Sequence, residues 1–301
     1  MKIKGLIENY INELLGKHGQ MYLFNLKAEF LKNTLCTSCE MGVTSEKVIP
    51  EDVVVSLTTF GKRLYEVYLT IESIMQGTMK PNRIILWLQD NLKNEELPFT
   101  LQKQMKRGLE VRYTKDTRSF KKLIPTLQLC PDSVIITIDD DVLYEIDTIE
   151  RLVLAYKKDH SHVYGCRVRK IEVDNKGEVM PYSTWKPIYY GTSPSNNNIC
   201  IGVGGILYPP HCFTNEVFNE EAYTRLCPNA DDLWFWMMAK EKGYTSVKVF
   251  THNIGGQDYL VNYNVQDNSL MKGNMGKSGN DIQFKAILNA YQGYNWLKYG
   301  K

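Results

Sequence analysis

The chain has 301 residues, which is long enough for one large domain or two small ones. Hydrophobic residues make up 43% of it and charged residues 23%, a balance that excludes a disordered chain or a low-complexity fibre. The 36 basic and 34 acidic residues leave a net charge of +2, so no overall attraction to nucleic acid is visible and we expect no nucleic-acid partner.

The N-terminal region predicts a helical extension. Apolar side chains recur at helical spacing from the start of the chain, and Gly16 or Gly19 can end this first helix. A second helix is predicted at about 23–35, with one apolar side formed by Leu23, Leu26, Phe30 and Leu31. Because lysines surround these apolar faces, residues 1–35 can either lie on an anionic membrane surface or pack onto the main domain.

From residue 52 onward the pattern changes to apolar strands that alternate with helices. The predicted strands are 53–57, 83–88, 110–113 and 134–138, and the predicted helices between them are 64–75 and 123–129. A further helix is expected after Asp147, with Glu150 completing a capping box. This alternation, with β-branched strands, predicts an α/β domain with a mostly parallel central sheet.

The second half of the chain has a looser texture. Residues 174–215 are rich in Pro, Gly, Asn and Tyr, and we expect a functional insertion there and no second core. The remaining predicted elements are a helix at 231–242 ended by Gly243, a last strand at 247–250 and a closing helix at about 281–296. The predicted organisation is a helical extension (1–45), an α/β catalytic domain (52–256) and a C-terminal loop and helix (257–301).

Three features favour a cytoplasmic location. The longest apolar runs fall far short of the roughly 18 residues that a membrane-spanning helix needs. No secretion signal is recognisable at the start, and the seven cysteines follow no regular framework, which suits a reducing compartment. Cys36 and Cys39 have C-x-x-C spacing, but no second pair follows at the distance typical of a zinc site.

The sharpest chemical signal is the run Asp139, Asp140 and Asp141 directly after the strand at 134–138. Adjacent carboxylates repel one another and are costly to desolvate unless a cation compensates them. Mg²⁺ and Mn²⁺ prefer carboxylate oxygens and keep positions open for phosphate. Because open α/β sheets bind ligands at the carboxyl ends of their strands, we expect a metal site here. The alternative is a solvated acidic turn that caps the next helix.

A succession of short motifs runs from the first predicted strand to this aspartate run. The motifs are 56–60, Arg63, 70–73, 80–87, 119–125 and 138–141. Together they resemble bacterial GT-A glycosyltransferases of capsule, lipopolysaccharide and exopolysaccharide assembly. The resemblance covers about 52–256 and is most specific at 121–125 and at the aspartates. It implies a GT-A fold, which is Rossmann-like, a nucleotide-diphosphate sugar donor such as a UDP-sugar, and Mn²⁺ or Mg²⁺ as cofactor.

The resemblance also implies roles for individual residues. The aspartate run would be a D-x-D motif, with Asp139 near the ribose and Asp141, with or without Asp140, on the metal that bridges the diphosphate. Thr58, Thr59 and Arg63 would contact the nucleotide, and Asp139 and His252 would be additional metal ligands. From their position and chemistry we also expect nucleotide-sugar contacts from Asp90, Lys121, Lys122, Gly204 and Gly205. Each has an ordinary alternative: a βα turn, a solvated lysine pair, a bend in a strand, or a hydrogen-bonded structural histidine.

Asp231 and Asp232 form a second acidic pair at the start of the helix at 231–242. Acids are common in a first helical turn because they interact favourably with the helix dipole, and this alternative alone explains one of them. The resemblance implies that Asp232 is the general base that deprotonates the acceptor hydroxyl, and that Asp231 is its partner. Direct displacement assisted by such a base inverts the anomeric configuration, while retention stays open.

These observations predict a metal-dependent glycosyltransferase that acts on a bacterial surface glycan or a lipid-linked oligosaccharide. Two rivals remain: a sugar-phosphate nucleotidyltransferase, disfavoured because no glycine-rich run follows the first strand, and a non-catalytic glycan-binding subunit. Aromatic residues crowd around 182–190 and 223–236, which fits a sugar groove or a packed core. We expect one of Trp234 and Trp236 in the core and the other in an acceptor groove.

Overall fold

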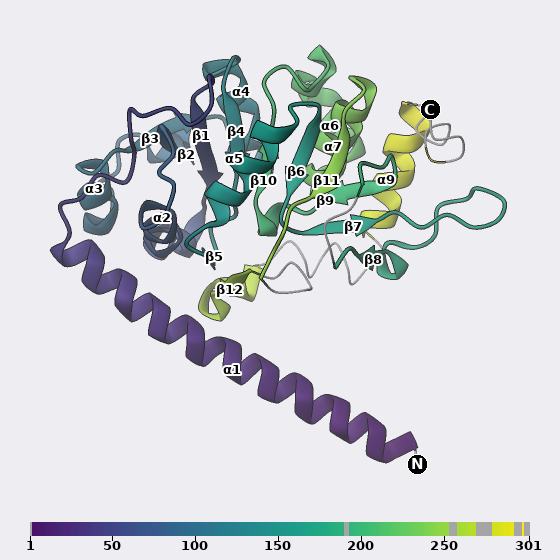
Figure 1. Ribbon diagram of the computed structural model, residues 1–301, viewed down its shortest axis with the longest axis horizontal. Coiled ribbons are helices and arrows are strands. Elements are labelled where there is room, and N and C mark those ends of the chain that lie inside the picture. Colours follow the sequence, from purple (N-terminus) through teal and green to yellow (C-terminus); the bar gives the residue numbers. More distant parts are fainter. Residues whose placement is uncertain (1, 190–192, 253–257, 269–278, 292–296, 298–301) are drawn as a thin grey trace.

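The computed structural model describes residues 2–189, 193–252, 258–268, 279–291 and 297, and its centre is a seven-stranded sheet (Figure 1). In sheet order the strands are β11 (Thr245–Lys248), β6 (His162–Gly165), β10 (Ile206–Tyr208), β4 (Val134–Thr137), β1 (Val53–Thr58), β2 (Arg83–Gln89) and β3 (Leu109–Thr114). All neighbouring pairs are parallel except the two that β10 makes, with β4 and with β6. The predicted α/β fold with a mostly parallel sheet is therefore confirmed.

Two small sheets and eight described α-helices complete the fold. The small sheets are β5 (Val142–Tyr144) with β12 (Tyr259–Val261), and β7 (Val168–Lys170) between β8 (Lys186–Pro187) and β9 (Asn198–Cys200). The helices are α1 (Lys2–Thr37), α2 (Val67–Met75), α3 (Phe99–Met105), α4 (Ile124–Leu129), α5 (Thr148–Lys158), α6 (Glu220–Leu226), α7 (Asp231–Glu241) and α9 (Gly279–Ala290). The predicted strand at 247–250 begins two residues earlier, and the part of the predicted closing helix at 292–296 lies outside the described residues.

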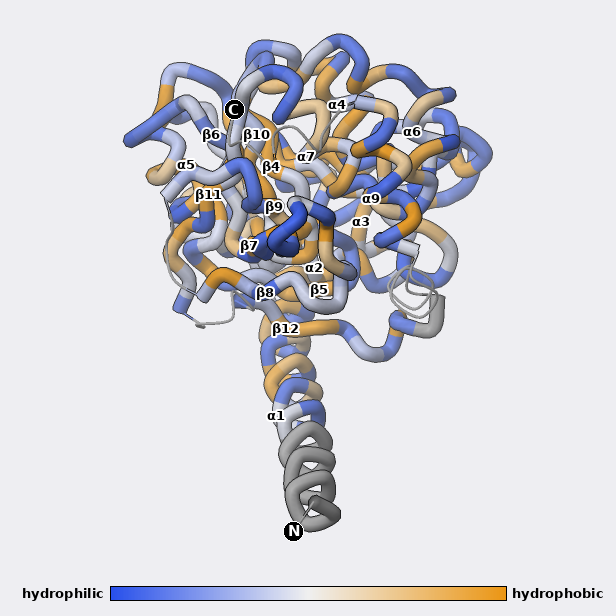
Figure 2. Tube along the Cα trace, turned by 90° about the vertical axis from the view of Figure 1, so that its right-hand side faces the viewer, coloured by the Kyte–Doolittle hydropathy of each residue, from blue (hydrophilic) through white to orange (hydrophobic). Residues whose placement is uncertain are grey.

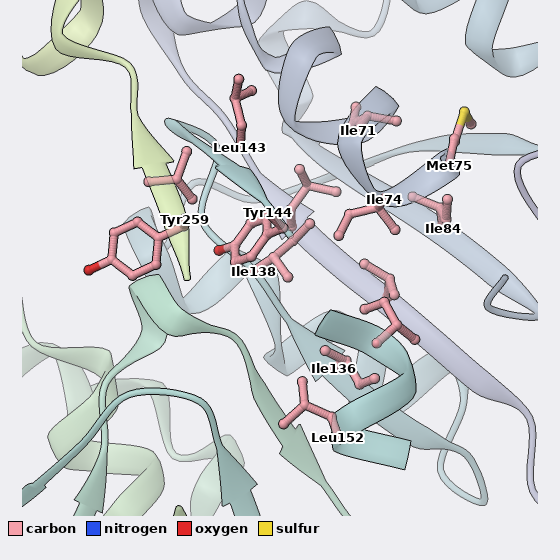
Figure 3. Close-up of a cluster of buried hydrophobic side chains, with 14 of the residues drawn as sticks. Ile71, Ile74, Met75, Ile84, Ile136, Ile138, Leu143, Tyr144, Leu152 and Tyr259 are labelled. Atoms are coloured by element: carbon pink, nitrogen blue, oxygen red, sulfur yellow. The ribbon is translucent and has the colours of Figure 1, made fainter. Parts of the chain in front are cut away.

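Side chains alternate between two cores, one on each face of the sheet. Ile136 of β4 belongs to the core that α2 and α5 cover, and Figure 3 shows it near Leu152. Ile135, its neighbour, belongs to the core that α7 and α9 cover. This alternation is the period of two that a strand imposes on its side chains. The strands read as unbroken apolar runs in the sequence because both faces are buried.

The second half of the chain supplies most of the second of these cores, so the expectation of a loose insertion without a core is wrong. Trp234 and Trp236 are both buried, and their indole N–H groups donate to the carbonyl oxygens of Val217 and Asn198. The expected acceptor-groove tryptophan is therefore also wrong. A buried indole needs an acceptor, and the chain supplies a backbone carbonyl to each of them.

The N-terminal region is one continuous helix, α1, and not two helices separated at Gly16 or Gly19. A glycine inside a helix costs only about 1 kcal/mol relative to alanine, so two glycines weaken the helix without ending it. Phe24, Ala28, Leu31 and Leu35 are buried against the domain. Figures 1 and 2 show α1 running outward from the domain beside β5 and β12.

The apolar side predicted for 23–35 divides in the structure. Only Leu31 of that set is buried, whereas Leu23, Leu26 and Phe30 are at least half exposed. The described part of the extension thus packs onto the domain, as one of the two alternatives held, and carries a second apolar stripe away from it. No described helix combines the length and the apolar content needed to cross a bilayer.

The capping box expected before α5 does not form. The Asp147 side chain accepts no hydrogen bond from the first turn and instead pairs with Arg151 at 3.1 Å. Glu150 accepts a hydrogen bond from the Thr78 hydroxyl at 2.5 Å. Asp147 and Glu150 thus bind Arg151 and Thr78 and do not cap the helix, a result that the spacing of the two acids along the chain does not predict.

One buried ion pair fastens α2 to the segment that follows α3. Glu72 is fully buried, and both its carboxylate oxygens lie 2.9 Å from Nη1 of Arg107. Gln104 donates to the same carboxylate at 3.0 Å. Nε of Arg107 donates to the carbonyl oxygen of Glu40, which ties the segment after α1 to the domain.

We expect Arg107→Ala to lower the free energy of unfolding by about 3–5 kcal/mol, because it leaves the Glu72 carboxylate buried without a cation. The matched control is Arg112→Ala, which removes a partly exposed ion pair with Glu110 and should cost about 0–1 kcal/mol. Urea unfolding followed by circular dichroism measures both. Equal losses for the two variants would contradict this interpretation of the pair.

Candidate active site

The ammonium group of Lys122 joins the two acidic clusters that the sequence singles out. Its Nζ donates to Oδ1 of Asp139 at 2.9 Å and lies 3.0 Å from Oδ2 of Asp231. Asp139 follows β4 at the carboxyl end of the sheet, and Asp231 is the first residue of α7. Lys122 itself is buried, on a short 3₁₀ helix (Arg118–Lys122) that leads into α4. A buried ammonium group without anions would be costly, so this contact holds three elements together.

Asp232 completes this cluster. Its Oδ2 accepts a hydrogen bond from the backbone N–H of Gly202 at 2.9 Å, and its Oδ1 is buried without a hydrogen-bond partner among the described residues. Burial and, to a smaller extent, the neighbouring charge of Asp231 raise the pKa of Asp232 to about 7, although Lys122 opposes both. A carboxyl group that titrates near neutrality can take up a proton at physiological pH.

Gly202 brings the backbone into this cluster because it has no side chain. A Cβ atom placed on it would lie 2.9 Å from Oδ1 of Asp232 and 2.9 Å from Nζ of Lys122. The Tyr144 hydroxyl binds the same turn by donating to the carbonyl oxygen of Val203 at 3.1 Å and accepting from the N–H of Asp139 at 3.0 Å. Neither Gly202 nor Tyr144 was predicted as a site residue. Gly202 stands two residues before the predicted Gly204, in the glycine-rich stretch 202–205, whereas nothing in the sequence marks Tyr144.

Arg63 compensates the other two aspartates. Its Nη1 donates to Oδ1 of Asp140 at 2.7 Å, and its Nη2 lies 3.0 Å from Oδ2 of Asp141. The Thr59 hydroxyl also donates to Asp140 at 2.6 Å, and Gln266 donates to Asp141 at 2.7 Å. Asp140 is buried, and burial raises its pKa to about 6 although Arg63 opposes this. In this arrangement Thr59 and Arg63 bind the acidic run itself, and Asp140 is enclosed by them.

Asp139 and Asp141 are the carboxylates that suit a metal ion. The Asp139 side chain is 31% exposed and that of Asp141 13%, against 7% for Asp140. Within the described part of the chain, no three His, Cys, Asp or Glu side chains are placed to hold a metal by themselves. Mg²⁺ usually takes only one or two carboxylates and completes its shell with water and substrate phosphates, so the pair fits an open site of that kind.

His252 does not join this site. Its Nε2 lies 2.8 Å from Oδ2 of Asp147 and its ring is largely exposed, so the structure favours the structural alternative to a metal ligand. The reason is that Asp147 does not cap α5. Its carboxylate instead contacts Arg151 through Oδ1 and His252 through Oδ2.

The two glycines expected to approach a sugar serve a bend in the chain. A Cβ atom on Gly204 would lie 2.6 Å from Cβ of Arg167, and Gly205 has φ +87°, a conformation that favours glycine. The close approach seen in the structure is to Arg167, which agrees with the alternative of a bend in the chain, and a contact of these glycines with a sugar stays a prediction.

Three other predicted contacts are placed as follows. The Thr58 hydroxyl donates to the carbonyl oxygen of Trp87 at 2.9 Å. Lys121 is buried and binds Asp116, away from the aspartate run. Asp90 begins a 3₁₀ turn (Asp90–Leu92) and is exposed at the carboxyl end of β2. Of these three side chains, that of Asp90 is the most exposed, and it lies at the carboxyl end of β2.

Comparison with known proteins adds little. No protein-family model and no curated protein matches the sequence. Among solved structures, the chain is similar to a mannosyltransferase from Pyrobaculum calidifontis in complex with GDP-Man and Mn²⁺, with TM-score 0.41 and 13% identity over 77% of this chain and 63% of that one. It is also similar to CMP:2-keto-3-deoxy-manno-octonic acid synthetase complexed with CTP, with TM-score 0.36 and 12% identity over 65% and 88% of the two chains.

The raised pKa of Asp232 predicts a pH-dependent difference between the wild type and Asp232→Asn. A raised carboxyl pKa means that the folded state retains a proton which the unfolded state has released, between about pH 4 and pH 7. The contribution of this group to stability therefore falls as pH rises through that window, whereas the asparagine side chain of the variant does not ionise. We expect the variant to gain stability relative to the wild type from pH 4 to pH 8.

Thermal unfolding of both proteins at several pH values measures this trend. Asp132→Asn is the control, because the Asp132 side chain is 86% exposed and its ion pair within the described residues is with the exposed His211. Parallel profiles for wild type and Asp232→Asn would show that Asp232 ionises normally.

Proposed function

We propose that the protein is a glycosyltransferase of the GT-A type that moves a sugar from a nucleotide-diphosphate donor, such as a UDP-sugar, to an acceptor hydroxyl. One observation carries this proposal. Lys122 brings Asp139, at the carboxyl end of the sheet, to the same point as Asp231 and Asp232 at the start of α7. A carboxylate site for the donor and a carboxylate base for the acceptor are thus adjacent.

Asp232 is the general base in this proposal. Its Oδ1 is buried and has no partner among the described residues, while Gly202 holds the other oxygen and so orients the carboxylate. The hydroxyl proton of the acceptor would pass to Oδ1 as the acceptor oxygen attacks the anomeric carbon. Attack from the side opposite the leaving group inverts the configuration at that carbon. Lys122 keeps the neighbouring carboxylates in place and moderates the repulsion that raises the Asp232 pKa.

Asp139 and Asp141 would hold Mn²⁺ or Mg²⁺. When bound, this ion neutralises the negative charge that develops on the departing nucleoside diphosphate. Arg63 and Gln266 fix Asp141, and Lys122 fixes Asp139, so both carboxylates are oriented before any ligand arrives. The acceptor we propose is a bacterial surface glycan or a lipid-linked oligosaccharide.

A panel of UDP- and GDP-sugars, incubated with the protein and Mn²⁺ or Mg²⁺, tests this function through release of nucleoside diphosphate. We expect Asp232→Asn to lower acceptor-dependent transfer by about 10²–10⁴-fold and to leave donor affinity unchanged. Asp141→Asn should weaken metal-dependent donor binding as well. Asp132→Asn is the control.

Two outcomes would contradict the proposal. Release of pyrophosphate from a nucleoside triphosphate and a sugar phosphate would identify a nucleotidyltransferase instead. Transfer that continues at the wild-type rate with a chelator present would remove the metal from the mechanism.

We also propose that α1 contacts the cytoplasmic face of a membrane, where lipid-linked acceptors reside. Its buried stripe is already used by the domain, so the contact would be made by the exposed stripe of Tyr22, Leu23, Leu26 and Phe30. Tyr22 is 65% exposed and Phe30 63%, values that are high for aromatic side chains on a structured helix. A helix on a membrane surface binds the interface through exposed apolar side chains such as these and through basic residues such as Lys17.

Sedimentation with vesicles that contain anionic lipid tests this contact. We expect the triple variant Leu23→Ser, Leu26→Ser and Phe30→Ser to lose vesicle binding, since it removes most of the apolar stripe without touching the buried one. Phe250→Ser is the matched control, because Phe250 is 67% exposed on a different part of the surface. Equal binding of the wild type and the triple variant would remove α1 from membrane contact.

A further inference from the structure

The strand β7 and the residue before it present two arginines on one face. Side chains alternate along a strand, so Arg167 and Arg169 share a side and Val168 points the other way. Val168 is buried in the core that α7 covers, which directs both arginines away from that core. β7 is the middle strand of its small sheet, and Arg169 pairs with Ile199 of β9 and with Pro187 of β8. The two arginines therefore stand on a braced strand and not on a free loop.

Arg167 lies against the glycine turn of the active site. Its carbonyl oxygen accepts from the N–H of Ile201 at 2.9 Å, and only the absence of a side chain on Gly204 allows the turn to pass so close. Its Nη1 donates to the hydroxyl of Tyr259, while its Nε is buried and has no hydrogen-bond partner among the described residues. This guanidinium group is therefore held in position by Tyr259 but keeps one N–H donor without an acceptor among the described residues.

Neither arginine has a carboxylate partner in the described part of the chain. By contrast Arg63, Arg107 and Arg151 each form an ion pair with a buried or largely buried carboxylate. The Arg169 guanidinium instead lies 5.1 Å from the centre of the Tyr182 ring. Two positive charges on one face, one of them with a buried unpartnered N–H, leave anion-binding capacity that the described residues do not use.

The arginines lie beside the proposed catalytic base. The turn that contacts Arg167 through Gly204 binds Asp232 through Gly202. The charges that act on two tyrosines agree with this placement. Burial raises the pKa of Tyr182, and the charges of Arg169, Asp232 and Arg167 all act on it. Burial likewise raises the pKa of Tyr259, on which Arg167, Asp139 and Asp141 act.

We propose that Arg167 and Arg169 bind an anionic substituent, a carboxylate or a phosphate group, on the acceptor that Asp232 deprotonates. This inference rests on the proposed function for the identity of the acceptor site. The position of the arginines favours an acceptor over a donor ligand. They belong to the β7–β9 sheet and contact the glycine turn that binds Asp232, whereas Asp141 and Arg63 lie after the ends of β4 and β1. Arginine's planar fork suits a two-oxygen contact with either anion.

Isothermal titration with three probes tests the site in the full chain: inorganic phosphate, methyl β-D-glucuronide and methyl β-D-glucoside. The glucoside replaces the carboxylate of the glucuronide by a neutral group. We expect the glucuronide and phosphate to bind, and the glucoside to bind about tenfold more weakly or not at all. Arg167→Ala and Arg169→Ala should each weaken both anions about tenfold and leave the glucoside unchanged.

Arg112→Ala is the matched control, since Arg112 lies on β3 and pairs with Glu110. Arg167→Lys keeps the charge and removes the fork, so it should retain phosphate binding better than glucuronide binding. If Arg167→Ala does not fold, as judged by circular dichroism, Arg169→Ala and Arg167→Lys decide the question.

Titration of the anions in the presence of saturating UDP separates the two possible sources of the anion. Binding that persists with UDP bound supports the acceptor site. Displacement of phosphate by UDP would place the arginines in the diphosphate pocket and overturn the proposal. No saturable binding of either anion, or the same affinity in the wild type and both alanine variants, would also overturn it. Failure of the proposed function is seen separately, as an absence of UDP binding and of nucleoside diphosphate release.

Discussion

A buried ammonium group, that of Lys122, is the constraint on which the rest of the site depends. It is placed by a 3₁₀ turn that the structure holds against the start of α7, because Arg118 donates to Asn229 at 2.7 Å. With Asp139 and Asp231 as its contacts and Asp232 close by, one positive charge faces three carboxyl groups. Burial, together with this excess of negative charge, explains why the pKa of Asp232 lies above that of an ordinary carboxyl group.

The sheet turns this local constraint into a site. Parallel strands β1 and β4 end at the same edge, so Thr59, Arg63 and the aspartates converge there without any loop having to fold back. The antiparallel strand β10 then returns from the glycine turn into the middle of the sheet, between β4 and β6. Because the turn is anchored by β10, Gly202 reaches Asp232 from a rigid element. The second core beneath α7 fixes the other side of the contact.

How much of this the sequence predicts differs between elements. The strands 53–57, 83–88 and 134–138 were predicted within one or two residues because burial on both faces makes them unbroken apolar runs. The two acidic clusters stand out in the sequence because adjacent carboxylates repel one another and call for a compensating cation. Their meeting through Lys122 could not be derived from spacing, since it depends on the turn geometry of a third segment. Whether these residues perform the proposed roles stays a prediction.

The errors share a physical origin, which is competition from distant partners. Asp147 contacts Arg151 and His252 and does not form the predicted local cap, and His252 therefore lies at Asp147 and not at the aspartate run. Trp236 found a backbone acceptor, Asn198, far along the chain, so a residue type common in sugar grooves became core. In α1, no local signal distinguishes the apolar residues that contact the domain from those that do not. Only the position of the helix on β5 and β12 separates Leu31 from Phe30.

Gly202 has a consequence for how this chain can vary. A methyl group on Gly16 or Gly19 would meet no atom within 4 Å. Alanine is therefore tolerated at both positions and would stabilise the helix. At Gly202 the smallest possible side chain would enter between a carboxylate and an ammonium group and separate them. Among related chains, a glycine at this place would therefore distinguish those that keep the ion cluster from those that keep only the fold.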